Sequence, residues 1–134
     1  MLALVVDDEE LVVGVVANIL KRSRYRVLRA RSVADARRIY SRTTLRLDVV
    51  VTDIQMPGGS GFELSRELAV LRPEIPVLLM SGGYRDTDLE VRAHLRPGRV
   101  FLEKPFRESA FLGCLSELRP ADDLGALAVP ASGK

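Results

Sequence analysis

Short apolar stretches rich in Val, Ile and Leu alternate along the chain with segments whose apolar residues recur every three or four positions. The apolar stretches are Leu2–Val6, Tyr25–Leu28, Val49–Val51, Val77–Met80 and Val100–Leu102, of which the second is the weakest. Apolar runs of this length are typical of strands buried on both faces, as in a parallel sheet. The pattern therefore predicts five strands.

A segment with helical spacing follows each predicted strand. The apolar stripes are Leu11, Val12, Val15, Val16, Ile19 and Leu20; then Ala36, Ile39 and Tyr40; then Leu64, Leu68 and Leu71; and last Ala110, Phe111, Cys114, Leu115 and Leu118. The fourth segment, Asp86–Leu95, has the weakest helical pattern. Five repeats of strand then helix predict a doubly wound α/β sheet with right-handed crossovers.

The 134 residues fit one domain, which we expect to span residues 1–118. After Leu118 the chain becomes rich in Ala, Pro, Gly and Asp and loses its periodic stripe. We expect residues 119–134 to form a tail or linker. This segment is too short for a DNA-binding or catalytic output domain.

Charge and cysteine usage limit the possible partners. The net charge is only +2 and the arginines are spread along the chain, so we expect no nucleic-acid binding by the domain itself. The apolar start Met1–Val6 is interrupted at once by Asp7, which argues against a signal peptide or membrane insertion. Cys114 is the single cysteine and has no internal partner, which favours a reducing, cytoplasmic setting.

Polar residues stand where the predicted strands end. Asp7 and Asp8 follow the first strand, Asp53 the third, Ser81 the fourth and Lys104 the fifth. Equivalent positions of parallel strand–helix units lie at one edge of the sheet, and the carboxyl edge is where open α/β sheets bind ligands. We therefore expect three carboxylates, one hydroxyl and one ammonium group to converge in a single cleft.

The chemistry of this set favours phosphoryl transfer. Three close carboxylates repel one another unless a cation neutralises them, and oxygen ligands without His or Cys favour Mg²⁺ over zinc. A bound metal would keep Asp53 ionised and nucleophilic. Lys104 adds a second positive charge, and Ser81 can donate a hydrogen bond to a phosphoryl oxygen. Positioning and charge neutralisation are most of what phosphoryl transfer needs.

Four segments resemble the signature motifs of response-regulator receiver domains, in order and at the usual spacing. They are Val5–Glu9, Thr52–Gly58, Leu79–Gly82 and Leu102–Phe106, and the resemblance extends from about Leu2 to Leu118. It implies a five-stranded parallel sheet in the flavodoxin-like order 2-1-3-4-5 with helices on both faces. It also implies a regulatory switch of two-component phosphorelay signalling. Such a domain is not an enzyme in the usual sense, because it catalyses only its own phosphorylation and dephosphorylation.

By this resemblance Asp53 is the phospho-acceptor, and Asp8 and Asp53 are direct metal ligands. Asp7 would act through metal-bound water, and the backbone carbonyl of Gln55 would complete the Mg²⁺ ligands. The family's pattern also makes Lys104 a site residue.

The resemblance further implies that Ser81 is the switch hydroxyl, that Phe101 is the switch aromatic, and that the Lys104-Pro105 bond is cis. Ser81 replaces the more common Thr but keeps the hydroxyl. Phe101 replaces Tyr, so it can swing inward but presents no hydroxyl to a partner. The implied partners are a histidine kinase or hybrid sensor kinase and a downstream protein in a bacterial cytoplasm, with the domain a monomer or weak homodimer.

Two other functions are weighed. A docking module with a non-functional phosphorylation site remains open. A phosphatase of the haloacid-dehalogenase type is disfavoured, because the position of its second catalytic Asp holds Gln55, which cannot act as an acid or base.

Several motifs have a simpler structural interpretation. Asp7–Glu10 could be the acidic start of a helix. Because Asp53 and Lys104 follow their own strands at the equivalent position, we favour a shared functional site instead. Gly58–Gly61 lacks the lysine of a phosphate-binding loop, so we expect a turn in which Ser60 caps the third helix. His94 is expected to pack or lie at the surface, and Cys114 to belong to the core.

Overall fold

The computed structural model describes residues 1–42 and 46–118, and within them it confirms the predicted doubly wound fold. The five parallel strands are β1 (Leu2–Val6), β2 (Arg26–Ala30), β3 (Val49–Asp53), β6 (Val77–Ser81) and β7 (Arg99–Glu103). Their spatial order is β2-β1-β3-β6-β7, which is 2-1-3-4-5 when only the strands of this sheet are counted. The expected tail, residues 119–134, lies outside the described residues.

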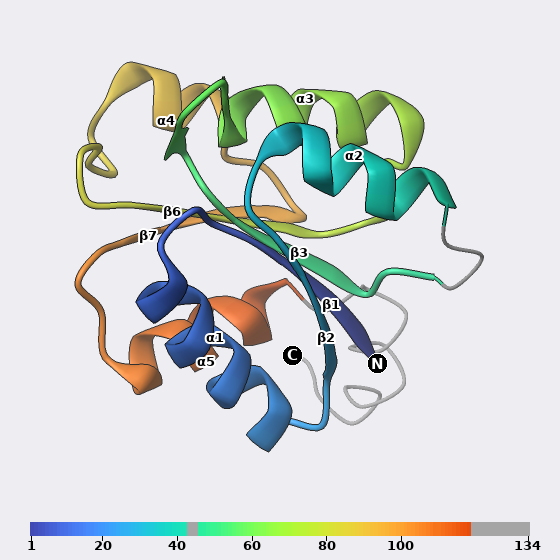
Figure 1. The fold of residues 1–134 in the computed structure, drawn as a ribbon. Helices are drawn as coiled ribbons and strands as arrows, with labels where there is room; N and C mark the ends of the chain where they lie inside the picture. The colour runs from blue at the N-terminus through green and yellow to red at the C-terminus, as the bar shows by residue number, and fades with distance from the viewer. Residues whose placement is uncertain (43–45, 119–134) are drawn as a thin grey trace, which may run out of the picture.

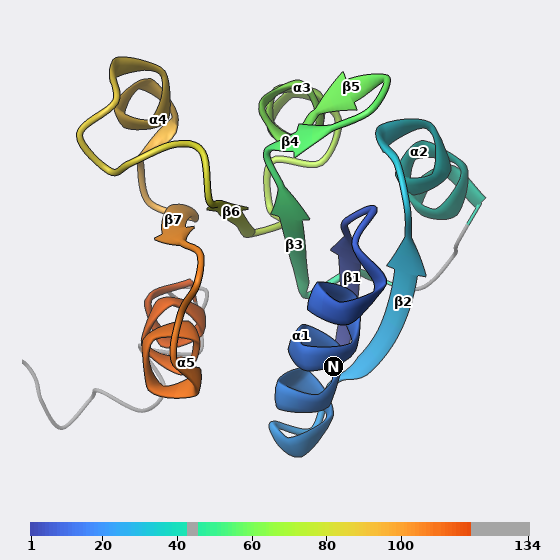
Figure 2. The same cartoon turned by 60° about the vertical axis from the view of Figure 1, so that its left-hand side comes forward.

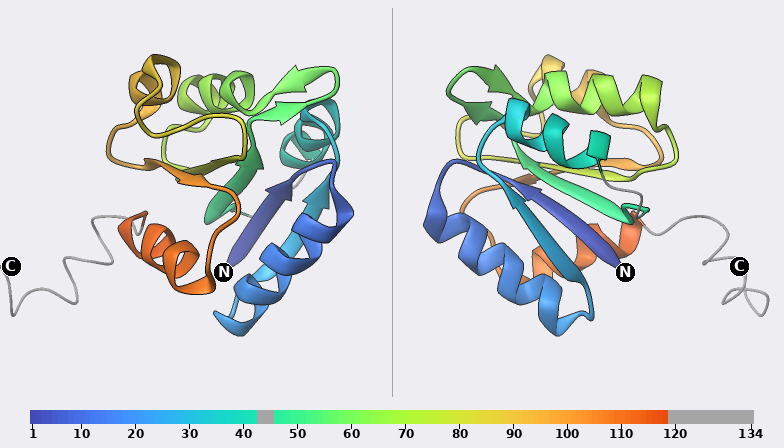
Figure 3. Two further views of the ribbon diagram at one scale, coloured as in Figure 1. Left: turned by 90° about the vertical axis from the view of Figure 1, so that its left-hand side faces the viewer. Right: turned by 45° about the vertical axis from the view of Figure 1, so that its right-hand side comes forward.

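Helices cover both faces of the sheet (Figures 1 and 3). One face carries α1 (Glu10–Arg22) and α5 (Glu108–Glu117), and the other carries α2 (Val33–Arg42), α3 (Gly61–Leu71) and α4 (Leu89–His94). The fourth helix has only six residues, which explains why its stripe was the weakest in the sequence. In the part of the chain that the structure describes, no helix is long and apolar enough to cross a bilayer.

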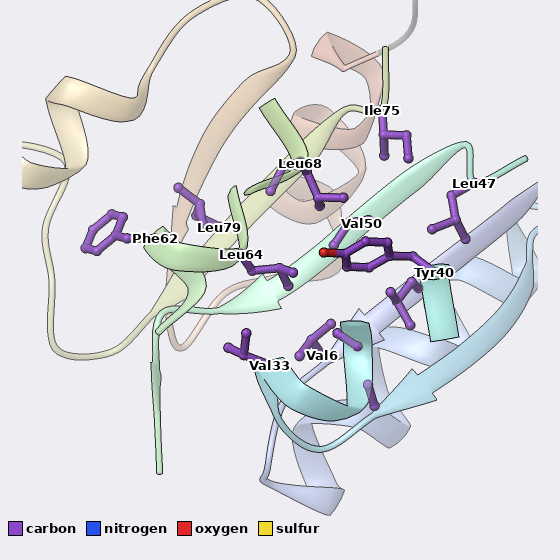
Figure 4. Close-up of a cluster of buried hydrophobic side chains, with 14 of the residues drawn as sticks. Val6, Val33, Tyr40, Leu47, Val50, Phe62, Leu64, Leu68, Ile75 and Leu79 are labelled. Carbon is purple, nitrogen blue, oxygen red and sulfur yellow. The ribbon is translucent and has the colours of Figure 1, made fainter. Parts of the chain in front are cut away.

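Each face of the sheet has its own core, because alternate side chains of a strand point to opposite faces. Every residue of β1, β3 and β6 is buried. Val6, Val50 and Leu79 face α2 and α3, where they pack against side chains such as Tyr40 and Leu64 (Figure 4). On the other face, residues of α1 and α5 are buried against the sheet, among them Val13, Val16, Ile19, Leu20, Phe111 and Leu115. Cys114 is half-buried at the edge of this second core, as predicted.

The predicted apolar stripe of α1 was wrong in two of its members. Leu11 is 87% exposed and Val15 is 54% exposed, whereas Val13 and Ala17, which the stripe omitted, are buried. Valine occupies so many consecutive positions of this helix that two overlapping stripes fit its sequence, and the packing selects one of them. Leu71, at the end of α3, is also exposed (59%).

A short hairpin, which the sequence pattern did not predict, connects β3 to α3 (Figure 2). It consists of β4 (Gln55–Met56) and β5 (Gly59–Ser60), with Gly58 at φ +81° in the turn between them. The predicted cap is confirmed, since the Glu63 amide donates to Ser60 Oγ and the Ser60 amide donates to the Glu63 carboxylate.

Candidate functional site

The carboxyl edge of the sheet brings the predicted acidic residues together. Asp7 and Asp8 directly follow β1 and Asp53 ends β3, and these strands are neighbours. One carboxylate oxygen from each of the three residues lies within 4.8 Å of the other two. Asp7 and Asp53 are buried, at 1% and 5% exposure, whereas Asp8 faces solvent.

Lys104 directly follows β7, the edge strand of the sheet, and its side chain extends into this cluster. Its Nζ donates to Asp7 Oδ2 at 3.0 Å and to Asp53 Oδ1 at 3.2 Å, and lies 3.5 Å from Glu9 Oε1. The Lys104 amide donates to the Ser81 carbonyl, which continues the pairing of β7 with β6 beyond the strand ends. The Lys104-Pro105 peptide bond is cis, as predicted.

One ammonium group does not balance the carboxylates of this cluster. Burial and repulsion from Asp7 raise the pKa of Asp53 to about 6, although Lys104 acts in the opposite direction. Burial lowers the pKa of Lys104, but its hydrogen bonds to Asp7 and Asp53 and their charges outweigh burial, so the net shift is upward. The remaining negative charge and the all-oxygen donor set suit a hard divalent cation such as Mg²⁺.

The Ser81 hydroxyl, at the end of β6, lies beside the cluster and joins two loops. Its Oγ donates to Gln55 Oε1 at 3.3 Å and accepts from the amides of Gly83 at 2.9 Å and Tyr84 at 3.2 Å. The sequence interpretation missed Tyr84 as a neighbour of this hydroxyl. A serine that accepts from amides two and three residues ahead is a common turn, and this was the signal available in the sequence.

Phe101 does not join the polar cluster. It is half-buried on β7 and packs against the core beneath α2, α3 and α4, as Tyr84 also does. The aromatic residue predicted to switch therefore lies one strand away from Ser81, with Leu79 of β6 opposite it in the parallel ladder.

A second residue that the sequence interpretation missed is Gly61, the first residue of α3. A Cβ at this position would lie 2.3 Å from the carbonyl oxygen of Asp53 and 3.0 Å from Ile54 Cα. The Gly61 amide donates to the Ile54 carbonyl at 2.9 Å. Only glycine lets α3 begin this close to the strand end that carries Asp53.

Comparisons with known proteins agree with this geometry. A family model described as the response regulator receiver domain matches residues 3–115. The transcriptional regulatory protein FixJ of Rhizobium meliloti is 36% identical over 109 residues, which are 81% of this chain and 52% of FixJ. The autoinducer 1 sensor kinase/phosphatase LuxN of Vibrio campbellii is 30% identical over 102 residues, which are 76% of this chain and 12% of LuxN.

A solved structure has the same fold. The crystal structure of a response regulator receiver domain protein from Clostridium thermocellum superposes with a TM-score of 0.79 at 26% identity, covering 92% of this chain and 97% of the other. The chain spans about half, or less, of the length of the curated relatives described above. A family model matches nearly all of the described domain, and the fold and the acidic cluster agree with it. The chain therefore belongs to the response regulator receiver domains, the regulatory switches of two-component signalling.

Proposed function

We propose that Asp53 accepts a phosphoryl group from a phosphohistidine of a histidine kinase in a Mg²⁺-dependent reaction. The observation that carries this proposal is the convergence of Asp7, Asp8 and Asp53 within 4.8 Å, with the Lys104 ammonium in hydrogen-bond contact with two of them. A carboxylate in such a cluster is poised to act as a nucleophile beside groups that neutralise phosphoryl charge.

In the proposed transfer an oxygen of Asp53 attacks the phosphorus atom. A P–O bond forms as the P–N bond to the histidine breaks, and the electron pair of that bond returns to the imidazole ring. With a pKa of about 6, the Asp53 carboxyl is mostly ionised at neutral pH and therefore nucleophilic. Lys104 Nζ lies 3.2 Å from Asp53 Oδ1, so its ammonium is placed to pair with a phosphoryl oxygen on that carboxylate.

The residues that would hold Mg²⁺ are Asp8 and Asp53 directly, Asp7 through water, and Gln55 through its backbone carbonyl. The fit rests on the donor chemistry, because three carboxylates converge here with a single nearby ammonium group. When bound, the ion supplies positive charge that favours the ionised form of Asp53 and offsets the charge of the phosphoryl oxygens.

Signalling is proposed to follow from the charge that phosphorylation adds, roughly −1.5 to −2. Ser81 Oγ is held to Gln55 by a long hydrogen bond of 3.3 Å, which it can exchange for one to a phosphoryl oxygen. Ser81 and Lys104 would move toward the phosphoryl group and Phe101 would turn inward. The surface of α4, β7 and α5 would then change shape in a population shift between two packings.

The partners we propose are a histidine kinase or hybrid sensor kinase and a downstream protein, in a bacterial cytoplasm, with the domain a monomer or weak homodimer. Support comes from the relatives, since a transcriptional regulator and a sensor kinase/phosphatase both carry a stretch similar to this chain.

The proposed change of the surface formed by α4, β7 and α5 is tested by amide exchange with and without a phosphate mimic. Equal exchange on α4, β7 and α5 in both states would exclude it.

The direct test is intact mass after addition of acetyl phosphate, with and without Mg²⁺. We expect a Mg²⁺-dependent, base-labile gain of one phosphoryl group that is absent in Asp53→Asn. Asp86→Asn is the matched control, because Asp86 is exposed in the loop before α4 and should leave the gain intact. No gain under any condition would overturn the proposal and favour a docking module with a non-functional phosphorylation site.

A further inference from the structure

A cavity of about 260 Å³ lies at the other end of the sheet from the acidic cluster. It is open to solvent on one side and lies between α3, the end of α4 and the start of β7. Its lining includes Arg66, Ala69, Val70, His94, Arg96 and Arg99. Arg99 is the first residue of β7, whereas Lys104 follows its last residue, so the length of the strand separates the cavity from the phosphorylation site. At about 30 Å³ for each water molecule, the cavity has room for roughly nine.

Arg99 forms the floor of this cavity and carries a buried charge. It is 6% exposed; its Nε donates to Ser65 Oγ at 3.1 Å, and its Nη1 donates to the carbonyls of Ile75 and Gly98, each at 3.0 Å. All three acceptors are neutral. Within residues 1–42 and 46–118, no carboxylate pairs with Arg99 and no acceptor receives a hydrogen bond from its Nη2. An arginine this deeply buried normally has a counter-charge.

The other cationic groups of the cavity also lack a counter-charge. Arg66 Nη1 lies 3.3 Å from the ring nitrogen Nε2 of His94 rather than beside an acid. Arg66 and Arg96 form no ion pair with any of the residues that the structure describes. Burial, followed by repulsion from Arg66 and Arg96, lowers the pKa of His94, as expected where positive charge has accumulated.

The carboxylates around this cavity are engaged elsewhere. Glu63 and Glu67, on the same helix as Arg66, pair with Arg37 of α2. Glu74 pairs with its neighbour Arg72. The charge of Glu90 on α4 acts on His94, but among the described residues Glu90 forms no ion pair with an arginine of the cavity; it accepts a hydrogen bond from the Tyr84 hydroxyl. Three guanidinium groups therefore share one concave site, and no carboxylate of the described residues is paired with any of them.

We propose that this cavity binds a small phosphate monoester. Guanidinium groups present forked donors that match the oxygens of a phosphate, and a dianion offsets more of three positive charges than a single carboxylate does. Ala69 and Val70 give the cavity an apolar wall, which suits the organic part of an ester. At about 260 Å³ the cavity is smaller than a typical site for a drug-sized ligand, which suits a small molecule. The site requires neither Asp53 nor a metal, so it is independent of the phosphoryl-transfer proposal.

The test is a titration followed by amide chemical shifts, with phenyl phosphate and inorganic phosphate as probes. Phenol serves as the uncharged control, and EDTA with constant ionic strength keeps phosphate from binding through a metal at Asp53. We expect saturable shifts at residues 65–70 and 94–99, with phenyl phosphate binding more tightly than inorganic phosphate and phenol producing no shift. An absence of saturation up to about 10 mM phenyl phosphate, or shifts that centre on Asp53 and Lys104, would overturn the proposal.

A pair of matched double variants separates the cavity from general surface charge. Arg66→Gln with Arg96→Gln should weaken phenyl phosphate binding at least about tenfold, because two charge-assisted contacts are lost. Arg26→Gln with Arg29→Gln removes the same charge from exposed positions of β2, at the opposite edge of the sheet, and should change affinity by less than about twofold. Arg66 and Arg96 are exposed, so both double variants should fold. Equal loss of affinity in the two would refute a specific site.

Discussion

Replacing Gly61 with alanine places a methyl group where the chain has no room for one. The added Cβ would lie 2.3 Å from the carbonyl oxygen and 3.1 Å from the carbonyl carbon of Asp53, and 3.0 Å from Ile54 Cα. All three are backbone atoms at the end of a central strand, so they cannot rotate away as a side chain would. Because non-bonded heavy atoms need about 3.5 Å, the start of α3 must move by roughly 1 Å.

The expected loss of stability follows from what this displacement breaks. The hydrogen bond from the Gly61 amide to the Ile54 carbonyl, 2.9 Å long, contributes about 1 kcal/mol. Phe62 and Leu64, which are 2% and 0% exposed, move with the helix, and overpacking a core of this kind costs about 1–3 kcal/mol. The higher helix propensity of alanine returns less than about 1 kcal/mol. We expect the free energy of unfolding to fall by about 2–3 kcal/mol.

Urea unfolding of Gly61→Ala measures this loss, with Gly14→Ala and Gly113→Ala as controls. The control positions are inside α1 and α5, and a Cβ at either meets nothing within 4 Å. Each control should gain about 0.5–1 kcal/mol, because glycine is a poor helix residue. With a urea dependence of about 1–3 kcal/mol/M, the midpoint of Gly61→Ala should drop by roughly 0.7–3 M while the controls rise. A Gly61→Ala midpoint at or above that of the wild type would refute the steric argument.

Three further substitutions test local features of the fold. Ser60→Ala removes the capping box with Glu63 and should lower the free energy of unfolding by about 1 kcal/mol in urea, whereas Ser60→Asp should keep most of it. Ser81→Ala leaves the Gly83 and Tyr84 amides without their acceptor and should cost about 1–2 kcal/mol; an equal loss in Ser81→Thr would count against this cause. Burial holds the pKa of His94 below its ordinary 6.5, so as the pH falls the unfolded chain takes up this proton before the folded chain does. The free energy of unfolding should therefore decrease as the pH falls below about 6.5. The decrease should be at most about 1.4 kcal/mol per pH unit. His94→Phe keeps the ring stacked on Phe62 and should lose this component, so urea midpoints at pH 5.5 and 7.5 that shift equally in both proteins would contradict it.

The sequence was sufficient for the central strands β1, β3 and β6, because they are buried on both faces and leave uninterrupted apolar runs. It was not sufficient for the buried face of α1, where Val12, Val13, Val15 and Val16 satisfy more than one helical stripe. The hairpin β4–β5 was missed because strands of two residues each carry no periodicity. These features are decided by packing, which a local pattern does not contain.

The acidic cluster could be predicted because its residues occupy one phase of a repeated strand–helix unit. Gly61 could not, since its role depends on a contact with the backbone of Asp53, from which a hairpin separates it in sequence. The arginine cavity was missed for a related reason. Arg66, Arg96 and Arg99 are dispersed along the chain, and a dispersed set of arginines is typical of a solvated surface until the fold brings its members together.

The acidic cluster and the arginine cavity lie at opposite ends of the sheet, yet one buried aromatic ring connects their surroundings. Phe62 stacks on His94 with ring centroids 4.5 Å apart and meets the edge of Tyr84 at 5.3 Å. The Tyr84 amide in turn donates to Ser81 Oγ. Phe62 belongs to α3, the helix that begins against Asp53 and that carries Arg66 one turn after Phe62. Because close-packed interiors transmit displacement rather than absorb it, we expect an anion bound at Arg66 to act on the helix whose first residue touches the strand that carries Asp53.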